Sequence, residues 1–127
     1  MPSGEPFLKI KLQLYCGGEI AMGPGKADLL EAIDREGSIS GAGRALGMSY
    51  RRAWMLVDTM NRCWSKPLVE TAPGGSARGG ARVTPFGSEV LQRFRALQLR
   101  AEAVRDSEDW SALQAAVRSF PKEHQRA

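Results

Sequence analysis

One short segment that begins at Ser40 constrains the fold of this chain more than any other part of the sequence. Ser40 is the expected N-cap of a short helix over residues 41–46, and Gly47 is placed to end that helix. Ser49 then predicts the start of a longer helix that runs to about Trp64. Two helices joined by so tight a turn, with a third helix before them, form a helix-turn-helix.

Patterns before this segment predict the elements that pack against it. Apolar and polar residues alternate over 7–15, which predicts a half-buried strand, and a glycine pair then predicts a turn into a short strand over 19–22. A stripe of apolar residues predicts a helix over 26–36. Gly37 is suited to end this helix because glycine readily adopts a positive φ.

A β-hairpin is predicted after the long helix. Short strands are expected at residues 68–71 and 82–84. The residues between them, 72–81, contain too much glycine for a helix or a packed strand. A hairpin with a long tip in this position is the wing of a winged helix.

The C-terminal part of the chain predicts a helix that pairs with a second copy. Thr84 and Pro85 are a suitable N-cap and first helical residue. Apolar residues then follow at alternating spacings of four and three, which suits a helix–helix interface. These candidate dimerisation residues are Val90, Phe94, Leu97, Ala101 and Val104. Whether the helix continues through residues 106–109 stays open.

These patterns predict an α+β fold in four parts. An N-terminal strand and hairpin region covers residues 1–25, and a winged helix-turn-helix domain covers residues 26–86. A C-terminal dimerisation helix, or pair of helices, covers residues 87–120, and a polar tail covers residues 121–127.

Positive charge is concentrated in the middle of the sequence. Residues 35–100 hold eleven of the 18 Lys and Arg residues but only four of the 14 Asp and Glu residues. Such a stretch suits a polyanionic partner. In a helix-turn-helix the second helix enters the major groove of duplex DNA, and arginine matches the paired acceptors of guanine. The candidate DNA-binding residues are Ser38, Ser40, Ser49, Tyr50, Arg51, Arg52, Met55, Arg62, and, on the wing, Arg78 and Arg82.

Other classes of site find little support. The glycine-rich run lacks the Gly-Lys-Ser/Thr of a phosphate-binding loop, and the single histidine, His124, lies in the polar tail without catalytic neighbours. Cys16 and Cys63 have no zinc or disulfide spacing, and we interpret them as free, buried thiols. No enzyme, cofactor or metal site is therefore expected. The tryptophans at positions 54, 64 and 110 are interpreted as core or dimer-interface residues.

The chain is expected to act in the cytoplasm. It contains neither a visible signal peptide nor an apolar run long enough to span a membrane.

Residues from about 27 to 97 resemble the N-terminal DNA-binding domain of the ModE-type molybdate-responsive regulators. The resemblance rests on a run through the helix-turn-helix and on a double-glycine wing. Its residues are Gly37-Ser38-Ile39-Ser40, Ala45-Leu46-Gly47-Met48-Ser49-Tyr50-Arg51-Arg52-Ala53-Trp54, Met60-Asn61, Leu68-Val69-Glu70, Gly74-Gly75, Gly79-Gly80 and Leu91.

The resemblance implies a winged helix that binds operator DNA through its second helix and wing, and that dimerises through the helix after the wing. In that family a C-terminal pair of modules binds molybdate. This sequence stops at Ala127, which leaves no room for such modules, so molybdate binding by this chain alone is doubtful. The alternative function is a protein-interaction module in which the same helices dock a protein partner and the wing is a surface loop.

Overall fold

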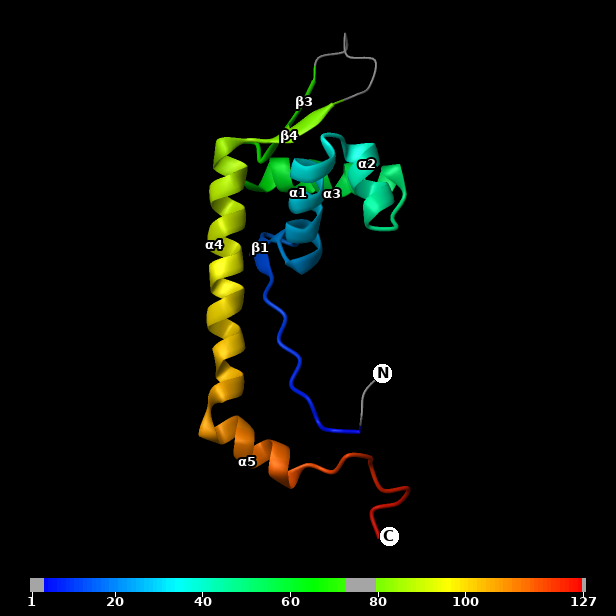
Figure 1. The fold of residues 1–127 in the computed structure, drawn as a ribbon, viewed down its shortest axis with the longest axis vertical. Helices are drawn as coiled ribbons and strands as arrows, with labels where there is room; N and C mark the ends of the chain where they lie inside the picture. Colours follow the sequence, from blue (N-terminus) through cyan, green and yellow to red (C-terminus); the bar gives the residue numbers. More distant parts are fainter. Residues whose placement is uncertain (1–3, 73–79, 127) are drawn as a thin grey trace. The chain divides into compact units, whose positions relative to one another are not determined.

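The computed structural model describes residues 4–72 and 80–126. The chain divides into two compact units (Figure 1). The central unit comprises residues 11–97, and the terminal unit comprises residues up to 10 together with those from 98 onward. The central unit thus takes in the N-terminal hairpin as well as the winged-helix elements.

The described residues form five α-helices, one 3-10 helix and two antiparallel strand pairs, which confirms the predicted α+β class. In chain order these elements are β1 (Leu14–Cys16), β2 (Glu19–Met22), α1 (Pro24–Glu36), α2 (Ile39–Ala45), α3 (Tyr50–Cys63), β3 (Val69–Thr71), β4 (Ala81–Val83), α4 (Pro85–Glu102), η1 (Ala103–Asp106) and α5 (Glu108–Ala116).

The N-terminal hairpin is shorter than predicted. β1 pairs with β2 around a turn in which Gly17 has a φ of 59°. Residues 7–13, predicted to be strand, pair with no strand in the described part of the chain. Their alternation survives in their burial, since Leu8, Ile10 and Leu12 are half-buried between exposed neighbours. An alternating pattern reports which side chains are covered, but it does not provide a partner for backbone hydrogen bonds.

The first two helices begin earlier than predicted. α1 begins at Pro24 rather than at residue 26, because proline fits the first helical position. Gly37 ends α1 with a φ of 78°, as expected. The N-cap of α2 is Ser38 and not Ser40, since the extended backbone of Ser38 lets its Oγ accept a hydrogen bond from the Gly41 amide at 2.9 Å.

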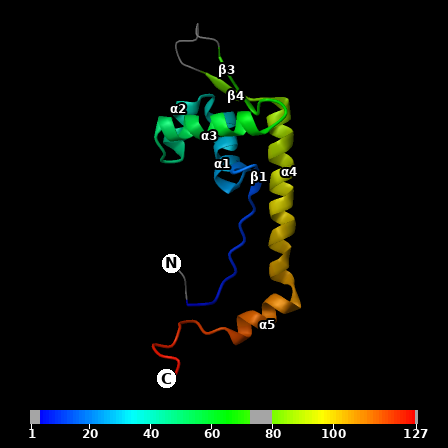
Figure 2. The ribbon, with the colours of Figure 1, turned by 180° about the vertical axis from the view of Figure 1, so that it is seen from behind.

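The third helix follows the prediction closely. Ser49 caps α3, and its Oγ accepts a hydrogen bond from the Arg52 amide at 3.1 Å. Ala53, Val57 and Met60 are buried on one side of α3. They join side chains of α1 and α2 in the core of the central unit. Figures 1 and 2 show α1, α2 and α3 gathered together, with the β3–β4 hairpin projecting beyond them.

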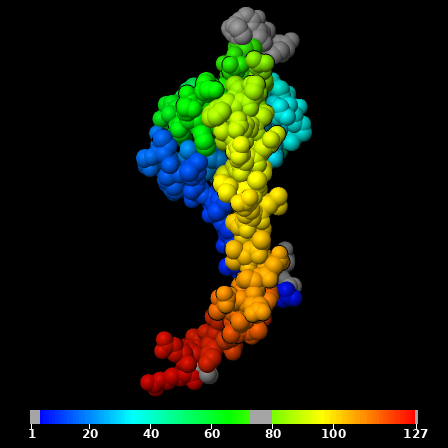
Figure 3. Space-filling model, turned by 90° about the vertical axis from the view of Figure 1, so that its left-hand side faces the viewer, coloured from blue at the N-terminus to red at the C-terminus, as the bar shows by residue number. Residues whose placement is uncertain are grey.

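The last helices are separate elements. α4 ends at Glu102 and is followed by η1, and Ser107 then caps α5 by accepting a hydrogen bond from the Trp110 amide. The helix is therefore not continuous through residues 106–109. In Figure 3 the part of α4 that belongs to the central unit, coloured light green to yellow, faces the viewer.

Two of the five candidate dimerisation residues have a different role. Val90 and Phe94 are 8% and 5% exposed and belong to the core of the central unit. Packing of α4 against the core of the central unit requires the same helical spacing of apolar residues as packing against a second helix does. The spacing alone therefore did not distinguish the two. Leu97 and Val104 are 55% and 52% exposed, and Ala101 is half-buried, so these three keep surface for a partner.

Candidate nucleic-acid interface

The outward side of α3 carries most of the predicted DNA-binding residues. Tyr50, Arg51 and Arg52 lie in the first turn, directly after the capping residue Ser49, and Met55 lies one turn further on. All of these side chains are exposed. Because the buried residues occupy the opposite side of the helix, the fold presents this side to the exterior without cost to the core.

A shallow depression lies along this side of α3. Its volume is about 360 Å³, and its lining mixes hydroxyl, guanidinium and apolar groups. The lining residues are Ser49, Arg51, Arg52, Met55, Leu56 and Thr59. The structure therefore brings together four of the predicted site residues around one concave surface.

The two arginines of the first turn are free to meet an anion. Neither Arg51 nor Arg52 forms an ion pair with the described residues of the chain. Burial lowers the pKa of the nearby Lys26, and the charge of Arg52 also lowers it, while Cys63 and Glu19 oppose this shift. Uncompensated cations at a helix N-terminus favour a negatively charged partner.

Arg62 differs from these arginines because it is already paired. Its guanidinium donates to Glu19 at 2.8 Å and to Asp58 at 2.9 Å. These carboxylates raise the pKa of Arg62, and the same pairing lowers the pKa of Glu19. Arg62 thus links the end of α3 to β2, a contact that the sequence did not indicate. Because two carboxylates neutralise its charge, Arg62 attracts a nucleic acid less than Arg51 or Arg52 does.

The wing stands on the β3–β4 pair, whose register joins Val69 to Val83 and Thr71 to Ala81. Arg82 projects from β4 and is largely exposed, although it donates to Glu70 across the hairpin at 2.9 Å. Arg78 lies outside the described residues.

The base of the wing is held against the helix-turn-helix. The Ala81 amide donates to the Gly37 carbonyl at 2.9 Å, and Ser38 forms a bridge with Gly80. Ser38 therefore acts as a cap and as a neighbour of the wing. Ser40 accepts a hydrogen bond from Arg44 at 3.2 Å.

Asn61 fixes the wing to α3. Its Oδ1 accepts hydrogen bonds from the Leu68 and Val69 amides at 2.8 and 3.1 Å, and its Nδ2 donates to the Val69 carbonyl at 2.9 Å. Sequence reasoning assigned no role to this residue. An amide side chain among the half-buried positions of an amphipathic helix was the available signal, because such a group needs hydrogen-bond partners.

Thr84 and Gly87 join the wing to α4. The Thr84 hydroxyl donates to the Pro67 carbonyl at 2.8 Å and accepts from the Gly87 amide at 2.9 Å. α4 approaches the chain so closely here that a Cβ on Gly87 would lie 2.3 Å from the Leu68 carbonyl oxygen. These contacts position the hairpin relative to α3 and α4.

The prediction that both cysteines are buried was wrong. Cys16 and Cys63 are free thiols, but Cys16 is exposed and Cys63 is half-buried. Trp54 is 46% exposed on α3 and so lies outside the core, and its place at a dimer interface stays a prediction. Trp64 is half-buried, and its Nε1 donates to the Ala21 carbonyl at 3.0 Å.

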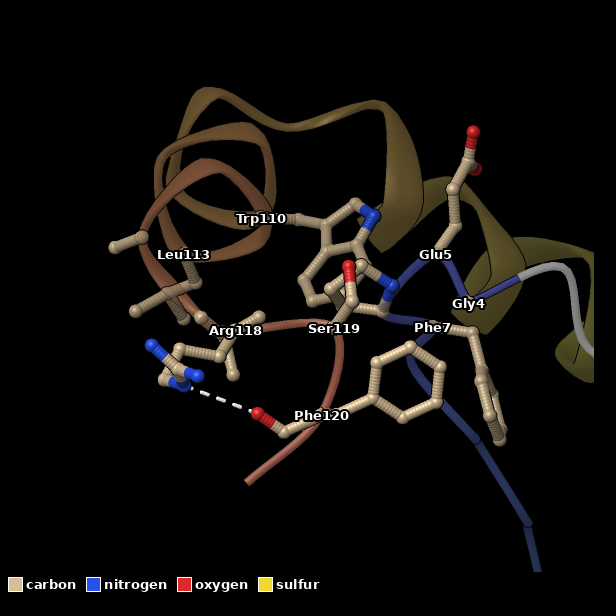
Figure 4. A pocket seen from close by; sticks show the side chains of 11 residues that line it. Gly4, Glu5, Phe7, Trp110, Leu113, Arg118, Ser119 and Phe120 are labelled. Atoms are coloured by element: carbon tan, nitrogen blue, oxygen red, sulfur yellow. Dashed lines mark hydrogen bonds between the residues drawn. The ribbon is translucent and has the colours of Figure 1, made fainter. Parts of the chain in front are cut away.

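The terminal unit holds a cavity of about 870 Å³ (Figure 4). The rings of Phe7, Trp110 and Phe120 surround it, and the Arg118 guanidinium donates to the Phe120 carbonyl at 3.0 Å. Leu113 and Val117 of the lining are also exposed. This surface is mainly apolar and is distinct in character from the basic side of α3.

The described residues contain no cluster of three or more His, Cys, Asp or Glu side chains suited to hold a metal ion. In the same residues no helix combines the length and the apolar character that crossing a membrane requires.

A helix-turn-helix followed by a hairpin whose base is bonded to it defines a winged helix-turn-helix domain. Solved structures support this class. The full-length LTTR LysG from Corynebacterium glutamicum matches 76% of this chain with 26% identity and a TM-score of 0.51, over 31% of its own length. The same protein with bound effector Arg matches with a TM-score of 0.52.

Sequence relatives identify the family. The molybdenum-pterin-binding protein MopA of Rhodobacter capsulatus is 45% identical over 74% of this chain. The DNA-binding transcriptional dual regulator ModE of Escherichia coli is 34% identical over 86% of it. The chain is therefore a ModE-like domain. It spans 36% and 40% of the lengths of these two relatives. No family model matches the chain.

Proposed function

We propose that this chain is the DNA-binding part of a cytoplasmic transcription regulator of genes for molybdenum or other metal or oxyanion metabolism. It binds duplex operator DNA as a homodimer, with one α3 helix in each half-site. The observation that carries the proposal is the exposed side of α3, where Arg51 and Arg52 lie without ion-pair partners in the described part of the chain.

The relatives support the gene class and the mode of action. Their names describe a DNA-binding transcriptional regulator, molybdenum transport proteins and molybdenum-pterin-binding proteins. Because this chain covers less than half of each of them, binding of molybdate is not carried over.

The terminal unit supports the homodimer. None of its described residues is buried. Four large apolar side chains are even more than 60% exposed, namely those of Phe7, Leu99, Leu113 and Phe120. A unit with many exposed apolar side chains and no core of its own suits contact with another protein surface. A two-fold dimer also places two α3 helices for the two halves of an operator.

A salt titration of DNA binding tests the proposed function. Sites selected from a random duplex pool are expected to bind with a log–log salt slope of about −3 or steeper, since each neutralised phosphate contributes about 0.9. Arg51→Ala should weaken the selected site more than random DNA, by about 1–3 kcal/mol, because a base edge is lost. Arg82→Ala should weaken both duplexes similarly. Absence of DNA binding at low salt would favour the protein-interaction alternative.

A further inference from the structure

The depression on α3 contains one exposed apolar side chain, which recognition of charge does not explain. Met55 is 52% exposed in the middle of the outward side of the helix. Arg51 and Arg52 lie one turn before it, and Thr59 lies one turn after it. A thioether cannot bind a phosphate as a cation does, and it is only a weak acceptor for a base edge.

The surroundings of Met55 extend this apolar surface. Leu56 is half-buried and lines the same depression of about 360 Å³. Guanidinium groups of Arg51 and Arg52 belong to the same lining. A complementary ligand therefore carries a small apolar group within an anionic or acceptor-rich surface.

The major groove of duplex DNA offers one such group. The C5-methyl of thymine projects into the groove, and the acceptor edge of guanine and the phosphates lie nearby. We propose that Met55 and Leu56 form a contact site for a thymine methyl group, with Arg51 or Arg52 on a neighbouring guanine or phosphate. This inference rests on the proposed function and adds a residue that determines which base is preferred.

Removing the methyl group from the DNA tests the contact directly. A duplex selected from a random pool is resynthesised with deoxyuridine in place of each thymine in turn, which deletes the methyl group and keeps the base pair. One thymine position in each half-site is expected to lose about fourfold in affinity, the size expected for burial of one methyl group. The other thymine positions should change little.

Protein variants assign the effect to Met55. Met55→Ala should bind thymine and deoxyuridine duplexes equally, whereas Met55→Leu should keep the preference, because an apolar side chain of similar volume remains. Both replacements suit an exposed helix position, so folding should be retained. Trp54→Ala is the matched control, since Trp54 is also exposed on α3 but does not line the depression. It should keep the preference.

The outcomes separate this inference from the proposed function. Failure to bind DNA, or binding without any sequence preference, overturns both. Selective binding with no methyl-sensitive thymine overturns only the role of Met55. That role is also overturned if Met55→Ala keeps the full difference in affinity between thymine and deoxyuridine duplexes.

Discussion

At the scale of single residues, the positions that organise the interface are polar groups bonded to the backbone. Asn61 forms three such bonds, and Thr84 joins two segments that meet beneath the wing. Neither side chain needs to touch DNA to matter, because both determine where the hairpin lies relative to α3.

Replacing Asn61 with Leu should lower the free energy of unfolding in urea by about 3 kcal/mol. The change removes the hydrogen-bond partner of the Leu68 amide, the Val69 amide and the Val69 carbonyl. Asn61→Asp should cost less, because its carboxylate still accepts from both amides. Equal stability of the Leu variant and the unchanged protein would show that the network contributes nothing.

The two thiols should react at different rates with iodoacetamide. Burial raises the pKa of Cys63, and the neighbouring Cys16 thiol raises it further, whereas Cys16 itself is exposed. At mildly alkaline pH, Cys16 should be alkylated faster than Cys63, because the raised pKa of Cys63 leaves less of its reactive thiolate. Peptide mass spectrometry measures both rates, and in urea they should become similar. Equal rates in the folded protein would contradict this assignment.

At the scale of elements, the close approach of α4 to the segment before β3 depends on one glycine. Gly87→Ala should destabilise the protein by about 2 kcal/mol or more in thermal or urea unfolding, because the new Cβ meets the Leu68 carbonyl and a methyl of Val83. Gly25→Ala in α1 is the matched control. Nothing lies within 4 Å of its added Cβ, so helix propensity should stabilise that variant by about 0.5–1 kcal/mol. A change in stability in the same direction for both variants would refute this packing argument.

The ion pairs that join α1 to α4 should contribute less to stability at low pH. Arg95 donates to Glu31 at 2.8 Å and to Asp28 at 2.7 Å, and its hydrogen bond holds the pKa of Glu31 below the ordinary value of 4.5. A carboxyl group with a lowered pKa stabilises the fold above its ordinary pKa, and that contribution is lost as the pH falls through the lowered value.

Arg95→Met therefore tests this pair by pH. Near pH 6 the free energy of unfolding of the unchanged protein should exceed that of the variant by less than about 1 kcal/mol, because the paired groups are partly exposed. This difference in the free energy of unfolding should shrink toward pH 3. Urea unfolding at several pH values measures this. Arg93→Met is the control, since Arg93 pairs only with Glu89 within α4 among the described residues. A difference that grows in acid would be inconsistent with the pairing.

At the scale of the whole molecule, sequence patterns predicted most of the fold but not its internal bonds. Capping serines and glycines indicated the helix-turn-helix, because their signals are local. Val90 and Phe94 were predicted to contact a second copy but pack in the core of their own chain. A stripe of apolar residues shows that one side of a helix is buried, but it does not identify the element that buries it. The pairing of Arg62 with Glu19 joins residues 43 positions apart, and no local pattern indicates such a contact.

Dimerisation should depend on the exposed remainder of the apolar stripe. The double variant Leu97→Asp with Val104→Asp places charge on two exposed apolar positions and should sediment as a monomer at tens of micromolar, where the unchanged protein sediments as a dimer. Both positions are outside the core, so circular dichroism should be retained. Gln92→Asp, at an exposed polar position of α4, should remain dimeric. A monomeric unchanged protein would refute the homodimer.

The junction at Thr84 has a mechanical consequence. A single residue separates β4 from α4, and its side chain is bonded on both sides, so the chain has no slack at which to pivot. The hairpin strands and the part of α4 that belongs to the central unit, residues 85–97, should therefore move together as one lever. Because Asn61 bonds the same hairpin to α3, a rotation of a few degrees of this lever would carry α3 with it. Contact of the hairpin with the DNA backbone and reading of the bases by α3 would thus change together.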